Sequence, residues 1–240
     1  MRASIMSEIP MLRVSDLHAW YDESHVLHGV GFEVRAGECV TLLGRNGAGK
    51  STTLKSIMGL VPRRAGSIQF QGRDLIAARP DQIGRAGIGF CPEDRGIFSG
   101  LSVEENLLLP PVIGPGGMSL DDIYALFPNL RERSKSAGTK LSGGEQQMLA
   151  IARILRTGAR LLLFDEPTEG LAPVIVQQIA AMIGEIKRRG FTILLVEQNF
   201  RFATQLADRH YLVEHGQVVE MITRDTLPEK QDMLHQRLGI

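Results

Sequence analysis

Glycines, a lysine and a serine stand together in residues 44–51 at a spacing that binds the phosphates of a nucleotide. The segment matches the pattern G-x-x-x-x-G-K-[ST] at every fixed position. Its glycines allow successive backbone N–H groups to curl around a phosphate, and a helix N-terminus directly after them adds positive potential. We expect Lys50 to reach the β- and γ-phosphates and Ser51 to offer its hydroxyl to Mg²⁺. The expected phosphate-binding residues are Gly44, Arg45, Asn46, Gly47, Ala48, Gly49, Lys50, Ser51 and Thr52.

Two neighbouring carboxylates follow the apolar run at residues 161–164. An ionised Asp165 at the end of a buried strand needs a cation or several hydrogen-bond donors, and Mg²⁺ held between Asp165 and Ser51 meets that need. Glu166 is then placed to orient and polarise a water molecule towards the γ-phosphate. Two acids that merely cap a strand end are the alternative. The phosphate loop favours the catalytic interpretation.

A third polar group ends the apolar run at residues 193–196. Glu197, Gln198 and Asn199 follow that run directly. In α/β proteins, an apolar strand that turns polar at its carboxyl end is where ligand chemistry usually lies. The pattern itself predicts no more than a strand-end acid at Glu197 and a helix cap at Asn199.

The apolar pattern predicts the elements that carry these groups. Continuous apolar runs at 40–43, 88–91, 161–164 and 193–196 are typical of central strands in a parallel sheet covered on both faces. In the first third of the chain, apolar and polar residues alternate, which predicts a half-buried antiparallel β layer. The alternating apolar positions are Leu12, Val14, Val30, Phe32, Val34, Ile68 and Phe70.

The remaining elements are predicted to be mainly helical. Three helices are expected between the second and third apolar runs, and they begin at Ser102, Ser119 and Ser142. A long helix starts near Pro173 and ends at Gly190. A hairpin around His215-Gly216 and a short helix introduced by Pro228 close the chain.

Composition limits the function classes. The chain has 240 residues, 43% of them hydrophobic, and its 27 basic and 27 acidic side chains balance. This balance argues against a broad nucleic-acid-binding surface. No apolar run approaches the roughly 20 residues that span a bilayer, and the first ten residues lack a secretory signal. Cys39 and Cys91 are expected to be buried thiols. The class is a soluble cytosolic α/β protein.

Residues 141–147, which read LSGGEQQ, identify the family. Alone they are a helix N-terminus with an ordinary capping box between Ser142 and Glu145, and hence a second potential anion site. About twenty residues further on comes LLLFDEP, and this combination resembles the signature of ATP-binding cassette (ABC) proteins. A P-loop kinase gives no reason for LSGGEQQ.

This resemblance implies a P-loop NTPase fold of the α/β class. A RecA-like core with an antiparallel β subdomain takes up 11–91 and 158–240, a helical subdomain is inserted at 92–157, and 1–10 form a tail of the single domain. The resemblance also implies ATP and Mg²⁺ as ligands and a head-to-tail dimer, joined in part by residues 169–173. In that dimer Ser142, Gly143, Gly144 and Glu145 act on the nucleotide of the other subunit.

Three further positions are placed by the resemblance. Tyr21 corresponds to the aromatic residue that stacks on adenine, although Trp20 beside it is an alternative. Glu93 stands where most cassettes have a glutamine that senses Mg²⁺ and the membrane partner. Gln198 stands where most have a histidine at the γ-phosphate, and we expect it to reach that phosphate as a neutral amide.

Together with VEENL at 103–107, LSGGEQQMLAIAR at 141–153, DEPTEGLAP at 165–173 and VEQN at 196–199, these departures resemble one of the two ATPase subunits of branched-chain amino-acid importers. Urea and short-chain amide importers look similar. The expected partners are a second, non-identical cassette, two transmembrane permease subunits and a periplasmic or extracellular substrate-binding protein. The isolated chain can also pair with itself. It is expected at the cytoplasmic face of the inner (plasma) membrane as a peripheral subunit. The competing hypothesis is a soluble, non-transport cassette ATPase, against which stand the single cassette, the lack of a cysteine cluster and the balanced charge.

Overall fold

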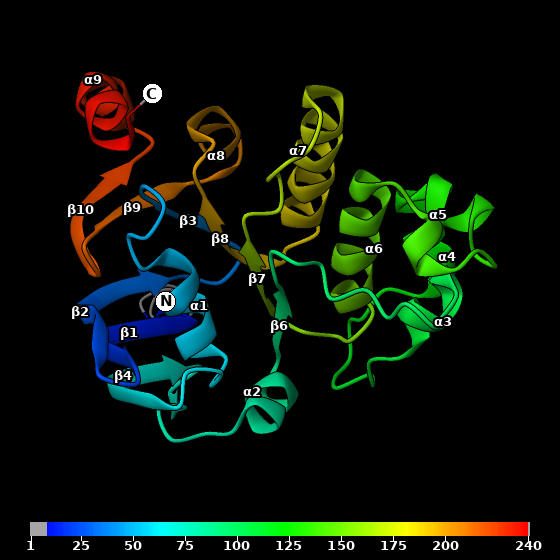
Figure 1. The fold of residues 1–240 in the computed structure, drawn as a ribbon, viewed down its shortest axis with the longest axis horizontal. Helices are drawn as coiled ribbons and strands as arrows, with labels where there is room; N and C mark the ends of the chain where they lie inside the picture. The colour runs from blue at the N-terminus through cyan, green and yellow to red at the C-terminus, as the bar shows by residue number, and fades with distance from the viewer. Residues whose placement is uncertain (1–8, 240) are drawn as a thin grey trace, which may run out of the picture.

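The computed structural model describes residues 9–239, which contain two β-sheets with helices around them (Figure 1). The larger sheet has six strands in the order β10-β9-β3-β8-β7-β6. Neighbouring strands are parallel except for β9 and β10, which form an antiparallel pair. The strands are β3 (Cys39–Leu43), β6 (Ile88–Cys91), β7 (Leu161–Asp165), β8 (Thr192–Glu197), β9 (Arg209–Glu214) and β10 (Gln217–Thr223).

The smaller sheet is antiparallel, with the order β2-β1-β4-β5. Its strands are β1 (Leu12–Tyr21), β2 (Ser24–Val34), β4 (Arg63–Phe70) and β5 (Arg73–Asp74). Helix α1 (Lys50–Ile57) lies between the two sheets in Figure 1, and its buried Leu54 and Ile57 share one hydrophobic cluster with residues of both. This sheet therefore closes one face of the core around the helix that starts at Lys50.

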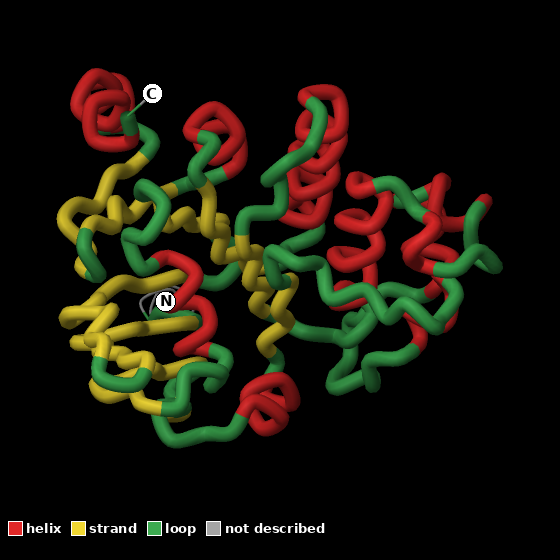
Figure 2. Tube along the Cα trace, viewed as in Figure 1, coloured by secondary structure: helices red, strands yellow, loops and turns green. Residues whose placement is uncertain are grey.

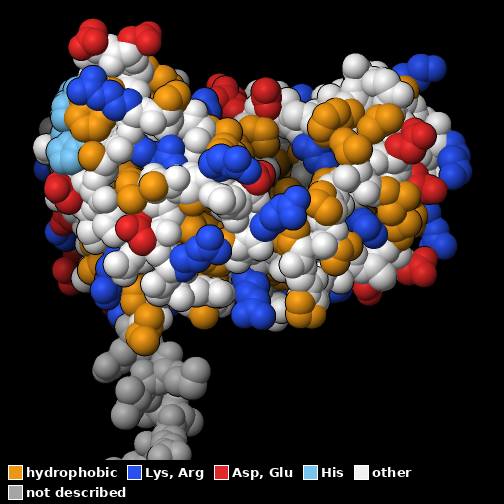
Figure 3. Space-filling view, turned by 90° about the horizontal axis from the view of Figure 1, so that it is seen from below, with side chains coloured by type: hydrophobic (Ala, Val, Ile, Leu, Met, Phe, Trp, Pro, Cys, Tyr) orange, Lys and Arg blue, Asp and Glu red, His pale blue; other side chains and the backbone are white. Residues whose placement is uncertain are grey.

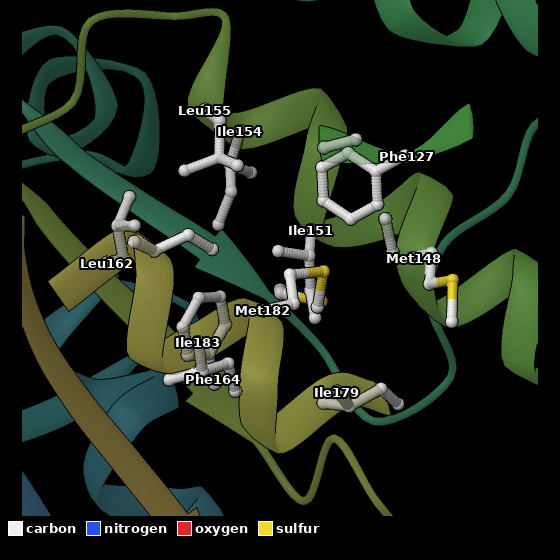
Figure 4. Close-up of a cluster of buried hydrophobic side chains, with 14 of the residues drawn as sticks. Phe127, Met148, Ile151, Ile154, Leu155, Leu162, Phe164, Ile179, Met182 and Ile183 are labelled. Atoms are coloured by element: carbon white, nitrogen blue, oxygen red, sulfur yellow. The ribbon is translucent and has the colours of Figure 1, made fainter. Parts of the chain in front are cut away.

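Helices cover the opposite face of the six-stranded sheet. They are α6 (Gly143–Leu155), α7 (Pro173–Arg188) and α8 (Phe200–Leu206). Figure 4 shows how α6 and α7 pack together over β7, because side chains from all three elements meet in one cluster. The labelled members of that cluster are Phe127, Met148, Ile151, Ile154, Leu155, Leu162, Phe164, Ile179, Met182 and Ile183.

The other helices lie to the right of the sheets, below them and at the upper left in Figure 1. Between β6 and β7 in the chain come α3 (Val103–Leu108), α4 (Leu120–Leu126), α5 (Pro128–Glu132), the 3₁₀ turn η1 (Gly138–Lys140) and α6, which form the right-hand end in Figures 1 and 2. Helix α2 (Pro80–Ala86) precedes β6, and α9 (Leu227–Leu238) follows β10. None of the helices within 9–239 is both long enough and apolar enough to cross a membrane.

The expected pattern of elements is confirmed for most of the described chain. The four apolar runs form β3, β6, β7 and β8, and the alternating residues at the start are buried in the antiparallel sheet. The helices expected from Ser102, Ser119, Ser142 and Pro173 are α3, α4, α6 and α7, and His215-Gly216 form the turn between β9 and β10. Cys39 and Cys91 are buried free thiols, as expected. Most of the expected tail, residues 1–8, lies outside the described residues.

Parallel pairing brings three strand ends to one edge of the sheet. Leu43, the last residue of β3, pairs with Glu197 at the end of β8. On the other side of β8, Val196 pairs with Asp165 at the end of β7. The three polar segments that follow these strands are therefore neighbours in space.

Candidate functional site

The phosphate loop joins β3 to α1 at this edge. Gly49, the residue before α1, has φ +102°, and a Cβ at this position would come within 2.8 Å of the Leu27 side chain. Glycine is therefore required there both for the left-handed backbone and for space. The Lys50 side chain folds back over the loop, where Nζ donates to the carbonyl oxygens of Gly44 at 2.9 Å and Arg45 at 3.1 Å.

A cavity of about 400 Å³ opens over this loop. Asn46, Gly47, Gly49, Lys50, Ser51, Thr52, Glu93 and Glu166 line it, and so do Val26 and Glu169. The first eight were expected at the site from the sequence. Val26 of β2 was missed because its place depends on how the antiparallel sheet packs beside the loop. Arg45 and Ala48 line a different hollow, beside the turn between β9 and β10.

Asp165 and Ser51 meet at the inner end of the loop. Ser51 Oγ donates to Asp165 Oδ1 at 2.7 Å, whereas the buried Oδ2 has no hydrogen-bond partner in the protein. Burial raises the pKa of Asp165, and the Ser51 hydroxyl opposes this shift. A buried carboxylate oxygen without a donor is costly unless a cation binds it. The serine hydroxyl and this carboxylate are oxygen ligands of the kind Mg²⁺ takes, so the two residues fit that ion.

Glu166 follows Asp165 with a left-handed backbone at φ +46°. One of its carboxylate oxygens, Oε1, lies 3.3 Å from Lys50 Nζ, and the other, Oε2, accepts a hydrogen bond from Gln198 Nε2 at 2.5 Å. Its backbone N–H donates to the Val196 carbonyl at 3.0 Å. The side chain is only 9% exposed, so the carboxylate is held between an ammonium and an amide at the wall of the cavity.

Glu93 and Glu169 complete an acidic side of the same cavity. Partial burial and the carboxylates of Glu166 and Glu93 raise the pKa of Glu169. Glu93 lines the cavity over the phosphate loop, and its expected part in sensing Mg²⁺ stays a prediction. Glu169 was expected only in the dimer-contacting segment, so its position on the cavity wall is an addition.

The polar end of β8 has two parts. Asn199 caps α8, because its Oδ1 accepts from Phe202 N at 3.1 Å, and the prediction of a helix cap is confirmed. Glu197 is buried, with 2% of its surface exposed, and accepts hydrogen bonds from Thr168, Gln198 and Asn199. Its sequence position gave no sign of these contacts.

Trp20 and Tyr21 have different surroundings at the end of β1. The Trp20 ring stacks on His25 with centroids 4.4 Å apart, and the Arg63 guanidinium lies 4.8 Å from its centroid. Tyr21 is 41% exposed and stacks on no other aromatic ring among the described residues. Tyr21 is not among the residues that line the phosphate cavity, so its role at adenine stays a prediction.

Residues 142–145 open helix α6 away from this cavity. Ser142 Oγ accepts from Glu145 N at 3.3 Å, and Glu145 Oε2 accepts from Ser142 N at 2.8 Å, so the expected capping box is present. Ser142 and Glu145 line a separate cavity of about 590 Å³ beside α5 and α7. Within one chain, this segment and the phosphate loop therefore face different cavities.

The chain is similar to known ATP-binding proteins of transporters. Residues 27–169 match the family model described as ABC transporter. A high-affinity branched-chain amino acid transport ATP-binding protein, BraG of Pseudomonas aeruginosa, is 44% identical over 212 residues, 87% of this chain and 91% of that protein. A probable branched-chain amino acid transport ATP-binding protein, LivF of Archaeoglobus fulgidus, is 36% identical over 96% of this chain and 99% of its own length.

A solved structure of the ATP-binding subunit of an ABC transporter has the same fold. It superposes with a TM-score of 0.78 at 31% identity, and the match covers 96% of this chain and all of the other. The two sheets, the phosphate loop and the helices between β6 and β7 thus form the cassette fold.

Proposed function

The chain belongs to the ABC transporter family as one of its ATPase cassettes, and from this membership we propose that it powers a membrane importer of branched-chain amino acids. The observation that carries the ATPase assignment is the meeting of Lys50, Ser51 and Glu166 at one cavity. Two observations support branched-chain amino acids as the substrate. The relatives BraG and LivF are named for branched-chain amino acid transport, and Glu93 and Gln198 depart from the usual cassette pattern.

The phosphate loop, Asp165 and Glu166 have different roles in the proposed hydrolysis of ATP. The backbone N–H groups of the loop and Lys50 bind the phosphates, and Ser51 and Asp165 would hold Mg²⁺. A bound Mg²⁺ neutralises charge on the phosphate oxygens. Glu166 accepts a proton from water as the water oxygen bonds to the γ-phosphorus and the bond from that phosphorus to the bridging oxygen breaks. The products are ADP and phosphate.

Gln198 orients the base in this scheme. Its Nε2 donates to Glu166 Oε2, and the other carboxylate oxygen lies 3.3 Å from Nζ of Lys50, the residue that we expect at the phosphates. A neutral amide neither takes up nor releases a proton at physiological pH. The proton of the attacking water therefore goes to Glu166.

Two cassettes form the working unit in this proposal. Ser142 and Glu145 line a cavity apart from the phosphate loop of their own chain. A head-to-tail pair brings this segment, with Gly143 and Gly144, to the γ-phosphate on the partner. We propose a non-identical second cassette, and pairing of two identical chains when this one is isolated.

The end of the molecule formed by α3 to α6 is the proposed contact with two permease subunits. Hydrophobic side chains reach the surface there (Figure 3), and Phe98, Leu108, Leu109 and Val112 are each close to half exposed or more. Over the whole chain, 27 basic and 27 acidic side chains balance, which does not favour nucleic acid. We place the chain at the cytoplasmic face of the membrane, with residues 92–157 as the helical subdomain and the remainder of 11–240 as the core.

The decisive experiment measures ATP hydrolysis by the complete complex. The tagged full chain is purified with the proteins that accompany it, reconstituted into liposomes and supplied with a substrate-binding protein. We expect the binding protein loaded with leucine to stimulate hydrolysis. Stimulation by urea or short amides and not by leucine would replace the substrate while keeping the transport ATPase. A chain that brings down no membrane protein would instead be a soluble cassette ATPase.

A further inference from the structure

Glu197 is a buried acid that the proposed reaction does not use. It ends β8, one residue before Gln198, and only 2% of its surface is exposed. None of the lysines, arginines or histidines within 9–239 forms an ion pair with it. Burying a carboxylate without a cation destabilises the fold unless hydrogen bonds to the carboxylate offset the free energy of its desolvation.

Three donors satisfy the Glu197 carboxylate. Thr168 Oγ1 donates to Oε1 at 2.6 Å. The backbone N–H groups of Gln198 and Asn199 donate to Oε2 at 3.1 and 3.0 Å. Burial raises the pKa of Glu197, and these three hydrogen bonds oppose that shift. Both carboxylate oxygens are thus in use, each on a different segment of the chain.

The two segments that Glu197 joins are those that carry the facing pair Glu166 and Gln198. Thr168 is two residues after Glu166 and is itself buried. Gln198 and Asn199 form the link between β8 and α8, where an extended strand changes into a helix. Neither Gln198 nor Asn199 belongs to β8 or α8, although the Asn199 side chain caps the start of α8. The Glu197 carboxylate constrains this link through backbone N–H groups.

We propose that Glu197 is a positioning residue for ATP hydrolysis: it joins Thr168 to the backbone of Gln198 and so fixes the Gln198 amide against Glu166. This inference rests on the proposed ATPase function. In this inference, Thr168 and Glu197 act together, and they affect the rate of hydrolysis only by holding Gln198 in place. Glu197 itself does not line the phosphate cavity.

The hydrogen-bond pattern makes a conservative replacement informative. In Glu197→Gln, the amide oxygen can still accept from the two backbone N–H groups, and the amide nitrogen can donate to the Thr168 hydroxyl. The geometry is then kept without the charge. In Glu197→Ala, two backbone N–H groups and one hydroxyl lose their acceptor.

The test is the steady-state kinetics of ATP hydrolysis by the complex that co-purifies with the tagged full chain. We expect Glu197→Ala to lower kcat about tenfold while KM for ATP stays within about twofold, because binding groups are unaffected. Glu197→Gln should stay within about threefold of wild-type kcat. In a Gln198→Ala background, Glu197→Ala should reduce kcat further by less than about twofold, since its effect passes through Gln198.

Thr168 provides a second route if Glu197→Ala does not fold. Thr168→Val keeps the shape and removes the donor, so it should lower kcat without raising KM. Thr168→Ser keeps the hydroxyl and should behave as wild type. Wild-type kcat in Glu197→Ala, or in Thr168→Val when the alanine variant is insoluble, would overturn the inference. The inference would also be overturned if the double variant Glu197→Ala/Gln198→Ala lost kcat by the product of the two single-variant losses.

The same assay separates this inference from the proposed function. If the wild-type complex hydrolyses no ATP, the proposed function fails. If the wild type is active and Glu166→Gln is not, the ATPase assignment stands, and the Glu197 and Thr168 variants alone decide the inference.

Discussion

Gln198 Nε2 donates a hydrogen bond to Glu166 Oε2 over 2.5 Å, so an amide and not an imidazole faces the proposed base. Most cassettes are expected to have a histidine at this position. A histidine can change its charge near neutral pH, whereas a glutamine cannot. The Gln198–Glu166 pair therefore contains a single group that can take up a proton.

Replacement of that group is the most direct test of the mechanism. Glu166→Gln keeps the size and the contact with Gln198 but removes the proton acceptor, so we expect hydrolysis to fall by at least about 100-fold. ATP should still bind and remain uncleaved. Turnover in the purified complex and the nucleotide retained after gel filtration measure the two effects. Glu132→Gln, at the exposed last residue of α5, is the matched control. Wild-type turnover in Glu166→Gln would show that another group is the base.

Gln198→Ala should have a smaller effect. It removes one donor to the Glu166 carboxylate, and the loss of such a hydrogen bond corresponds to a reduction in kcat of about tenfold. KM for ATP should change little. Single-turnover measurements would separate the chemical step from product release. A complete loss of hydrolysis would mean that Gln198 does more than orient Glu166.

Asp165→Asn should separate stability from activity. Burial raises the pKa of Asp165, so the ionised form destabilises the nucleotide-free fold at pH values above the usual carboxyl range. Asparagine removes that charge and keeps an acceptor for Ser51. We expect a higher melting temperature than wild type at pH 7, a gain that shrinks as the pH falls towards 4. Hydrolysis should be lost.

Thermal melts with Mg²⁺ and with EDTA provide the second readout for this variant. Mg²⁺ should stabilise the wild type in the presence of ATP and should have little effect on Asp165→Asn. Asp232→Asn, an exposed position on α9, controls for the removal of an acid elsewhere. Equal stabilisation of both variants by Mg²⁺ would exclude Asp165 as a ligand.

Tyr21 and Trp20 can be distinguished by nucleotide affinity. Trp20 is already stacked on His25, whereas Tyr21 is 41% exposed. Stacking on a base is worth about 1–3 kcal/mol, so Tyr21→Ala should weaken ATP binding about tenfold, and Tyr21→Phe should preserve it. Isothermal titration calorimetry gives the constants. A larger loss in Trp20→Ala than in Tyr21→Ala would reverse the assignment.

Below about pH 6.5, we expect the stability of the fold to depend mainly on His210, a histidine that does not line the phosphate cavity. His210 in β9 is buried, its Nδ1 lies 2.6 Å from Thr41 Oγ1, and its Nε2 has no partner. Burial and then the Arg224 charge lower its pKa to about 4. The unfolded chain therefore binds a proton that the folded chain does not, and stability falls as the pH drops from about 6.5 to about 4.

His210→Asn should remove this dependence. The largest slope expected from one such group is about 1.4 kcal/mol per pH unit. Urea unfolding between pH 4 and 7 measures it. His215→Asn is a matched control, since His215 is exposed and has a left-handed backbone that asparagine tolerates. An unchanged slope in His210→Asn would place the acid sensitivity elsewhere.

The sequence predicted the elements that carry the site because their signals are local. Continuous apolar runs mark β3, β6, β7 and β8, and serine capping boxes mark the starts of α3, α4 and α6. The phosphate loop is equally local. Its glycines, Lys50 and Ser51 lie within a few residues of one another, and strand pairing then places Asp165 beside them.

Contacts between distant segments could not be predicted in the same way. The antiparallel sheet brings Val26 to the phosphate cavity, and the β7–β8 pairing brings Thr168 to Glu197. Neither pair has a sequence spacing that reveals it. The hydrogen bond from Gln198 to Glu166 depends on the register of β7 and β8, so it could not be predicted from the sequence. The expected contact of Gln198 with the γ-phosphate concerns a bound ligand and stays a prediction.

The left-handed backbone of Glu166 bears on how its variants should be interpreted. At φ +46°, the main chain already determines the direction in which the side chain leaves the strand end. A glutamine at this position inherits that direction, and both residues accept the same modest conformational cost. A glycine relieves that cost and also removes the carboxylate. Glu166→Gly can therefore raise the melting temperature of an inactive enzyme, so thermal screening for stable variants would favour loss of the base.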